Sequence, residues 1–279
     1  MKGPIVPMFE QLSETTLRLA AFAGIFFFMA AGEFALPRRT LVLGRGMRWL
    51  TNLAIVVLDS IVVRLLFPLA TVGTALWAEA AGFGLFHSLA LPGWLAGVLG
   101  FLILDFAIWG QHVASHKIPI LWRVHRVHHS DRDIDVTTAL RFHPIEIVLS
   151  MLFKMGIVAV LGIPAMAAFI FEVVLNGMAM FNHANLRLPL WLDSVLRLVV
   201  VTPDMHRVHH SVIHDETDSN YGFNLSVWDR MFSTYIPQPR EGHDGMTIGL
   251  SEYQSEEPAR IAWVLGFPFK PLTKRNRDQ

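Results

Sequence analysis

Long apolar runs limit the possible folds of this chain more than any other feature. They cover residues 17–36, 50–70 and 91–110, and two shorter runs follow at 145–161 and 165–181. A helix needs about 20 apolar residues to cross a bilayer. The first three runs therefore predict membrane-spanning helices. The two shorter runs are separated by Gly162-Ile163-Pro164 and predict a tilted or shallow helical hairpin.

Composition supports a membrane protein and excludes several other classes. The chain is 53% hydrophobic and 16% charged, against about 25% charged residues in an average soluble domain. Its net charge is +0, so composition gives no case for nucleic-acid binding. It has no cysteine, which excludes disulfides, thiolate nucleophiles and thiolate metal ligands. We expect an all-α integral membrane bundle of about four spans plus interfacial helices, with 71–90 and 188–201 as interfacial candidates.

Histidines gather in three clusters that point to metal binding. His112 and His116 are four residues apart, and the pattern H-x-x-H-H occurs twice. The first copy is His125, His128 and His129, and the second is His206, His209 and His210. A helix brings positions i, i+3 and i+4 onto one face, so each cluster directs its imidazoles to a common point. Imidazole nitrogen suits iron, zinc, copper and nickel. Together, these clusters could supply enough nitrogen ligands for two metal ions.

Two further histidines and several carboxylates have a suggestive context. His143 precedes the predicted hairpin and is as consistent with a supporting role as with a ligand, whereas His183 follows the hairpin and is favoured as a ligand. Ligating histidines usually donate their second N–H to a carboxylate or carbonyl. Six acids near the clusters could accept such bonds, although a solvated loop charge or a helix cap is the better interpretation of any single one. They are Asp131, Asp133, Asp135, Asp204, Asp215 and Asp218.

Basic residues predict which side of the membrane carries the histidines. One set lies between the first two runs and another lies in the first histidine region: Arg38, Arg39, Arg45 and Arg48, and Arg123, Arg126, Arg132 and Arg141. Both sets fall on the same side if the first three runs each cross. Because basic loops remain inside, we expect a multi-pass protein with its histidine clusters on the cytoplasmic face.

The motifs together resemble the fatty acid hydroxylase / sterol desaturase superfamily of integral membrane di-iron enzymes. The similarity covers about 90–237 and includes the three histidine clusters, the stretch from Asp135 to Glu146 and Asn182-His183-Ala184-Asn185. It also includes the stretch from Asp218 to Asn224 and that from Trp228 to Tyr235. This divides the chain into N-terminal membrane helices (1–90), a hydroxylase-like catalytic region (91–237) and a C-terminal cytoplasmic tail (238–279).

The resemblance implies a set of site residues. The implied ligands of two iron ions are His112, His116, His125, His128, His129, His206, His209 and His210, with His183 as a ninth and His143 as an alternative. Candidate groups supporting the ligands are Asp218, Asn220, Asn224 and Asn182. Some members have a histidine four positions before the one at 183, where this chain has Ala179. Zinc could replace iron on isolation, and electrons would come from an external donor, which we expect to be a separate electron-transfer protein.

These observations predict a membrane-bound, O2-dependent monooxygenase that hydroxylates a C–H bond of a lipid, such as a fatty acyl chain or a sterol. A lipid desaturase or an ether-lipid monooxygenase on the same scaffold is the alternative. A zinc-dependent membrane hydrolase is less favoured because no H-E-x-x-H motif occurs. A metal transporter is also less favoured, since it would place its ligands within the spans.

Overall fold

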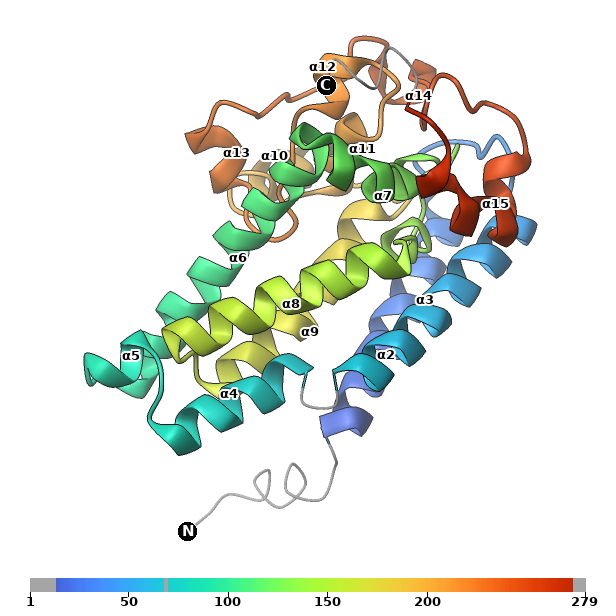
Figure 1. The fold of residues 1–279 in the computed structure, drawn as a ribbon. Helices are drawn as coiled ribbons and strands as arrows, with labels where there is room; N and C mark the ends of the chain where they lie inside the picture. The colour runs from blue at the N-terminus through green and yellow to red at the C-terminus, as the bar shows by residue number, and fades with distance from the viewer. Residues whose placement is uncertain (1–13, 68–69, 273–279) are drawn as a thin grey trace.

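The computed structural model describes residues 14–67 and 70–272, which form helices and loops without any β-strand. Figure 1 shows a bundle of long helices that carries a cap of short helices at one end. The prediction of an all-α membrane bundle with a histidine-rich cap is confirmed.

The long helices form the membrane part. They are α2 (Glu14–Ala35), α3 (Gly46–Leu66), α6 (Gly93–Lys117), α8 (Pro144–Leu161) and α9 (Ala165–His183). In the described part of the chain, 5 segments are long and apolar enough to cross a membrane: these helices, with α3 counted inside Gly46–Ser88. Two shorter helices, α4 (Ala70–Ala81) and α5 (Leu85–Ser88), lie at the end away from the cap (Figure 1). The chain is therefore a multi-pass membrane protein.

The hairpin of α8 and α9 leaves the cap and returns to it (Figure 1). His143 begins α8, where its ring nitrogen accepts the Ile145 N–H, and Pro144 occupies the first turn. Gly162 ends the helix at a φ of 68°, a left-handed conformation that glycine adopts without strain. Since each arm has crossing length, the end of α9 returns to the level at which α8 began.

Short helices and turns build the cap. They are α7 (Pro119–His129), η1 (Thr138–Leu140), α10 (Leu190–Leu196), α11 (Pro203–His209), α12 (His214–Thr217), α13 (Val227–Met231), α14 (Gly242–Gly245), η2 (Glu257–Ala259), α15 (Ile261–Gly266) and η3 (Phe267–Phe269). The loop between α2 and α3 reaches the same end of the molecule (Figure 1). The two arginine sets therefore lie on one side, as the sequence predicted.

Buried arginines join the membrane helices to the cap. Arg48 at the start of α3 is 1% exposed, and its Nε and Nη1 lie 2.6 Å and 2.7 Å from carboxylate oxygens of Asp131 and Asp135. Burial raises the pKa of Asp131, but the Arg48 guanidinium more than offsets this and lowers that pKa to about 2. Arg141 donates to the Val127 carbonyl of α7 at 2.9 Å and to the Asn52 side chain of α3 at 2.9 Å. The position of α7 is thus fixed from α3.

The C-terminal tail covers the other side of α7. Arg126 donates to the carbonyls of Phe267 at 2.9 Å and Lys270 at 2.6 Å, and its guanidinium lies over the Phe267 ring. Trp122 and Val127 pack with Phe267 in one buried cluster. Helix α7 is therefore held between α3 and the tail.

We expect Arg48→Met to lower the free energy of unfolding by about 3–5 kcal/mol, because the change leaves buried carboxylates without a counter-charge. Thermal and denaturant unfolding of the purified protein in detergent would measure this loss. Arg240→Met is the matched control, since Arg240 pairs with Asp215 at the surface, with 64% and 65% of their side chains exposed. An unfolding midpoint for Arg48→Met equal to that of the control would contradict the structural role.

Candidate metal centre

Nine histidines from four helices meet where the cap joins the bundle. The end of α6 carries His112 and His116, and α9 ends at His183. Helix α7 carries the first H-x-x-H-H, and α11 with the residue after it carries the second. None of the nine is more than 3% exposed. The imidazoles are thus removed from water, and their nitrogens need partners inside the protein.

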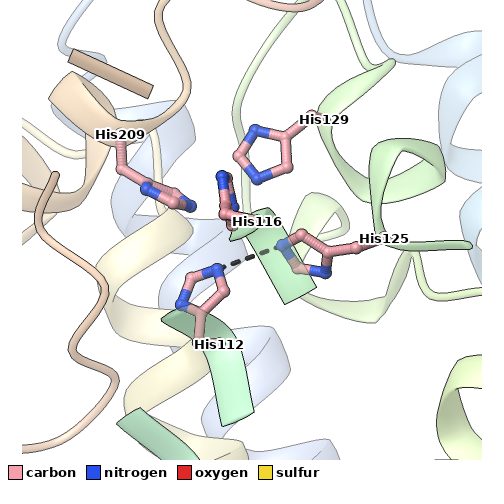
Figure 2. Close-up of side chains that lie close together, drawn as sticks. All are labelled: His112, His116, His125, His129 and His209. Atoms are coloured by element: carbon pink, nitrogen blue, oxygen red, sulfur yellow. Dashed lines mark hydrogen bonds between the residues drawn. The ribbon is translucent and has the colours of Figure 1, made fainter. Parts of the chain in front are cut away.

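The side chains fall into two groups, each of which could hold a metal ion. The five-histidine group is His112, His116, His125, His129 and His209 (Figure 2). The four-histidine group is His128, His183, His206 and His210. In each group, one ligand atom from every residue lies within 4.8 Å of all the others. The groups are adjacent, because the His129 and His210 rings stack with centroids 4.7 Å apart.

The two H-x-x-H-H motifs each contribute to both groups. In α7, the i and i+4 residues (His125 and His129) join the five-histidine group, and the i+3 residue His128 joins the other. In α11 this is exchanged: His206 and His210 join the four-histidine group and His209 the five-histidine group. The repeated motifs therefore do not each form one half of the site, but both bridge the two groups.

Hydrogen bonds orient three rings of the five-histidine group. The Nδ1 atoms of His112 and His209 each lie 2.7 Å from a main-chain carbonyl, of Tyr221 and Ser219 respectively. His125 Nδ1 lies 2.6 Å from Glu146 Oε1. Since these oxygens only accept, each Nδ1 carries the hydrogen and each Nε2 presents a lone pair. The Nε2 atoms of His112 and His125 are nevertheless 3.1 Å apart (Figure 2). Two facing lone pairs repel unless a cation lies between them.

In the four-histidine group, nitrogen lone pairs also face one another, and here they converge on the Nε2 atom of His183. His183 Nδ1 lies 2.8 Å from the Ala179 carbonyl, so its Nε2 also presents a lone pair. That Nε2 lies 3.0, 3.1 and 3.2 Å from the Nε2 atoms of His128, His206 and His210. One lone pair cannot accept three N–H bonds. Nitrogens bound to one ion at about 2 Å lie roughly 3 Å apart, so a metal ion fits this arrangement.

Comparison with known proteins agrees with this geometry. Residues 97–234 match a family model described as fatty acid hydroxylase. This region of the chain, residues 97–234, belongs to the fatty acid hydroxylase family. No solved structure matches the chain.

Several hydroxylases and monooxygenases are similar to this chain. The chain is 30% identical over 163 residues to alkylglycerol monooxygenase of Xenopus tropicalis, which is 56% of this chain and 34% of that protein. It is 32% identical over 143 residues to an ornithine lipid hydroxylase of Rhizobium tropici, which is 51% of this chain and 42% of that protein. It is 27% identical over 139 residues to cholesterol 25-hydroxylase of Mus musculus, which is 50% of this chain and 46% of that protein. The chain thus spans less than half the length of these relatives.

Burial keeps several of these histidines uncharged. It lowers the pKa of His128, His129, His206 and His210 well below the ordinary value, and neighbouring imidazoles lower it further. Burial and the nearby His125 lower the pKa of His209 to about 3. Metal ions bind the neutral imidazole, so at neutral pH these side chains are in the form that binds metal.

The other predicted site residues have different positions. His143 lies outside both groups, because its Nδ1 accepts the Ile145 N–H and its Nε2 lies 3.3 Å from the Leu265 carbonyl. Asp218 Oδ1 is 3.5 Å from His116 Nδ1. The side-chain amides of Asn182 and Asn220 donate to the main-chain carbonyls of Phe223 and Met205. Asn224 is 2% exposed, and its main-chain carbonyl accepts the Val201 N–H. These asparagines hold the loops around the histidines.

Sequence reasoning missed most partners of the histidines. Of the aspartates considered as possible partners, Asp131 and Asp135 pair with Arg48 and Asp204 pairs with Arg207, whereas Asp218 lies near His116. Glu146 supports His125; in the sequence it stood only as the last residue of the family-like stretch from Asp135, three residues after His143, and was not expected as a histidine partner. The carbonyls of Ala179, Ser219 and Tyr221 leave no sequence signal, because every residue has one.

Substitution separates His183 from His143 as the ninth ligand. We expect His183→Ala to lower the bound metal per chain, because it removes the nitrogen closest to the other three of its group, and His143→Ala to retain the wild-type content. Elemental analysis of the purified proteins measures both. The opposite result would move the ninth ligand to His143.

We expect Glu146→Gln to weaken metal binding about 10–100-fold, because the amide no longer fixes the charge and orientation of His125. Competition with a calibrated chelator measures the affinity. Glu252→Gln, an exposed position on the cap, is the matched control. Equal affinities of the two variants would remove Glu146 from the site.

Proposed function

We propose that this chain is a membrane-bound, O2-dependent di-iron monooxygenase that hydroxylates a C–H bond of a lipid. The observation that carries the proposal is the pair of adjacent groups of buried imidazoles at the end of an apolar helical bundle. The names of the relatives support the reaction class, since these proteins are hydroxylases and monooxygenases of lipids or alkylglycerols.

Each histidine group would hold one ion. The five-histidine group and the four-histidine group offer only nitrogen donors, which suit iron and also allow zinc to bind on isolation. When bound and supplied with electrons, two iron ions would provide the activation of O2 that is needed to oxidise an unactivated C–H bond. A separate electron-transfer protein would supply those electrons.

The chain's own residues would position and isolate this centre. The Tyr221, Ser219 and Ala179 carbonyls hold the rings of His112, His209 and His183, so that their lone pairs point inward. Burial of all nine imidazoles excludes water from the site. We propose that this face lies in the cytoplasm, because the arginine-bearing loop between α2 and α3 lies at the same end of the bundle as the cap.

An ether-lipid monooxygenase is the second candidate. It is favoured by three relatives named alkylglycerol monooxygenase, from Xenopus tropicalis, Danio rerio and Homo sapiens, which are 30%, 35% and 29% identical to the chain. A desaturase would use the same metal ligands. A hydrolase with a single zinc ion is less favoured, because catalytic zinc has about three protein ligands and nine histidines gather here.

Lipid mass spectrometry tests the proposal. Membranes that contain the protein, a reductant system and heavy-isotope O2 should accumulate a lipid with one labelled oxygen atom. Loss of two hydrogens without label would indicate a desaturase, and cleavage of alkylglycerols to an aldehyde would indicate the ether-lipid reaction. The matched control is His210→Ala. Unchanged lipids in membranes that contain iron-loaded wild-type protein, with electrons supplied, would contradict all three oxidative reactions.

A further inference from the structure

Helix α10 is amphipathic, but it buries its charged face and exposes its apolar face, which is the reverse of a surface helix on a water-soluble protein. Its charged residue Asp193 forms an ion pair with Arg197, the residue that follows the helix, and the two are only 6% and 7% exposed. Its apolar residues Leu190, Trp191 and Val195 are 78%, 70% and 58% exposed. Soluble proteins place the charged face of such a helix outward. The surroundings of α10 are therefore apolar.

Helix α13 shows the same inversion. Its Asp229 is fully buried and accepts hydrogen bonds from the indole of Trp109 at 3.0 Å and from the main-chain N–H groups of Tyr221 and Gly222 at 2.9 Å each. Its last residue, Met231, is 64% exposed, and the next, Phe232, is 49% exposed. The acid is thus used inside the protein, and the apolar side chains point outward.

The two helices are joined into one surface. The Ser226 hydroxyl and the Arg230 guanidinium both donate to the Arg197 carbonyl at 2.8 Å, and Val200 forms a bridge with Leu225. The exposed apolar side chains of this surface, which we call the α10–α13 face, are Leu190, Trp191, Val195, Leu198, Val199 and Met231. Contiguous apolar exposure of this kind marks an interaction site.

Contacts with α6 fix the depth of this surface. Trp228 beside Asp229 donates its indole N–H to Asp105 at 2.8 Å, and the Phe106 ring lies 5.1 Å from the Trp228 ring and 5.7 Å from the Phe232 ring. Asp105 and Phe106 belong to a helix that is apolar and long enough to cross the membrane. Helix α13 therefore packs beside a membrane-crossing helix, below the level of His112 on that helix.

The exposed face of α6 leads directly to this surface. Trp94, Val98, Leu102 and Phe106 follow one another at a spacing of four residues and are 73%, 52%, 38% and 39% exposed. On a helix this spacing forms one stripe, and on a membrane-crossing helix such a stripe faces lipid. The stripe ends at Phe106, which touches α13.

We infer that the α10–α13 face is embedded in the bilayer and contacts the acyl chains of the leaflet next to the cap. Lipid is the occupant that explains both the inverted helices and their continuity with the α6 stripe. Arg187 and Arg230, at the edge of the face, are exposed and suit the phosphate head groups of that leaflet. The cap is thus partly immersed in the membrane rather than held above it.

This placement also bears on the substrate, an extension that rests on the proposed function. Phe106 and His112 are six residues apart on α6, which is roughly 9 Å along the helix. The loop that Asp229 fixes is the one whose Tyr221 carbonyl orients His112. Acyl chains of the leaflet therefore lie about two helical turns from the metal centre, and a lipid substrate would reach it without leaving the bilayer.

Spin labels test directly whether the face is immersed in lipid. The chain has no native cysteine, so a label attaches only to a cysteine that is introduced by substitution. Trp191→Cys, Leu198→Cys and Met231→Cys would be labelled in the full-length, metal-loaded protein in vesicles of phosphatidylcholine and phosphatidylglycerol. Collision of each label with O2, which concentrates in lipid, is compared with collision with a water-soluble nickel chelate. We expect the ratio of O2 collisions to nickel-chelate collisions at all three positions to match that at Trp94→Cys on the lipid-facing stripe. It should exceed the ratio at Arg240→Cys on the cap several-fold.

The controls make each outcome decisive. Only variants with wild-type metal content are scored, and three positions are used so that a misfolded one can be replaced by another. Ratios equal to that of Arg240→Cys would place the face in water and overturn the inference. Labels shielded from both reagents would place a protein or a second copy of this chain there and would equally overturn it. None of these measurements depends on enzyme activity, so they would still locate the face if the proposed function were wrong.

Discussion

The structure depends on the convergence of uncharged imidazole lone pairs inside the protein. A buried acceptor without a partner costs about 1–3 kcal/mol, and the Nε2 atoms of His116, His129 and His209 have no hydrogen-bond partner among the described residues. In the other group, three Nε2 atoms approach that of His183 within 3.2 Å. Cations would satisfy all of these nitrogens together, and the free energy of metal binding would then contribute to folding of the cap.

Such a centre requires that helix ends distant in sequence be held in fixed positions. The N-terminal helices do much of this, although they lie outside residues 97–234 that match the family. Glu33 at the end of α2 accepts the main-chain N–H groups of Val136 at 2.6 Å and Asn185 at 2.8 Å. Arg48 holds the loop that follows α7. The first two helices are thus part of the same folding unit as the histidine cap.

The sequence predicted the membrane bundle, the helices that carry the histidines and their common end of the molecule. It could do so because those features follow from local periodicity and from the positions of arginines. It could not predict how His128 and His129, neighbours in sequence, divide between two groups, because that depends on how α7 is rotated against α6 and α11. Nor could it predict that Asp131, expected as a histidine partner or a solvated charge, is 2% exposed and bound to Arg48.

The orientation of α10 shows the same limit of sequence periodicity. The stretch 188–201 predicted an interfacial amphipathic helix, but periodicity gives two faces without saying which one is turned inward. The answer comes from tertiary structure: the Arg197 guanidinium pairs with Asp193 and donates to the Pro237 carbonyl, so the polar face is turned toward the segment that follows α13. In water this arrangement would leave large apolar side chains exposed on one face. It becomes stable when the leaflet supplies the missing contact, and the membrane is then part of the environment that determines the fold of the cap.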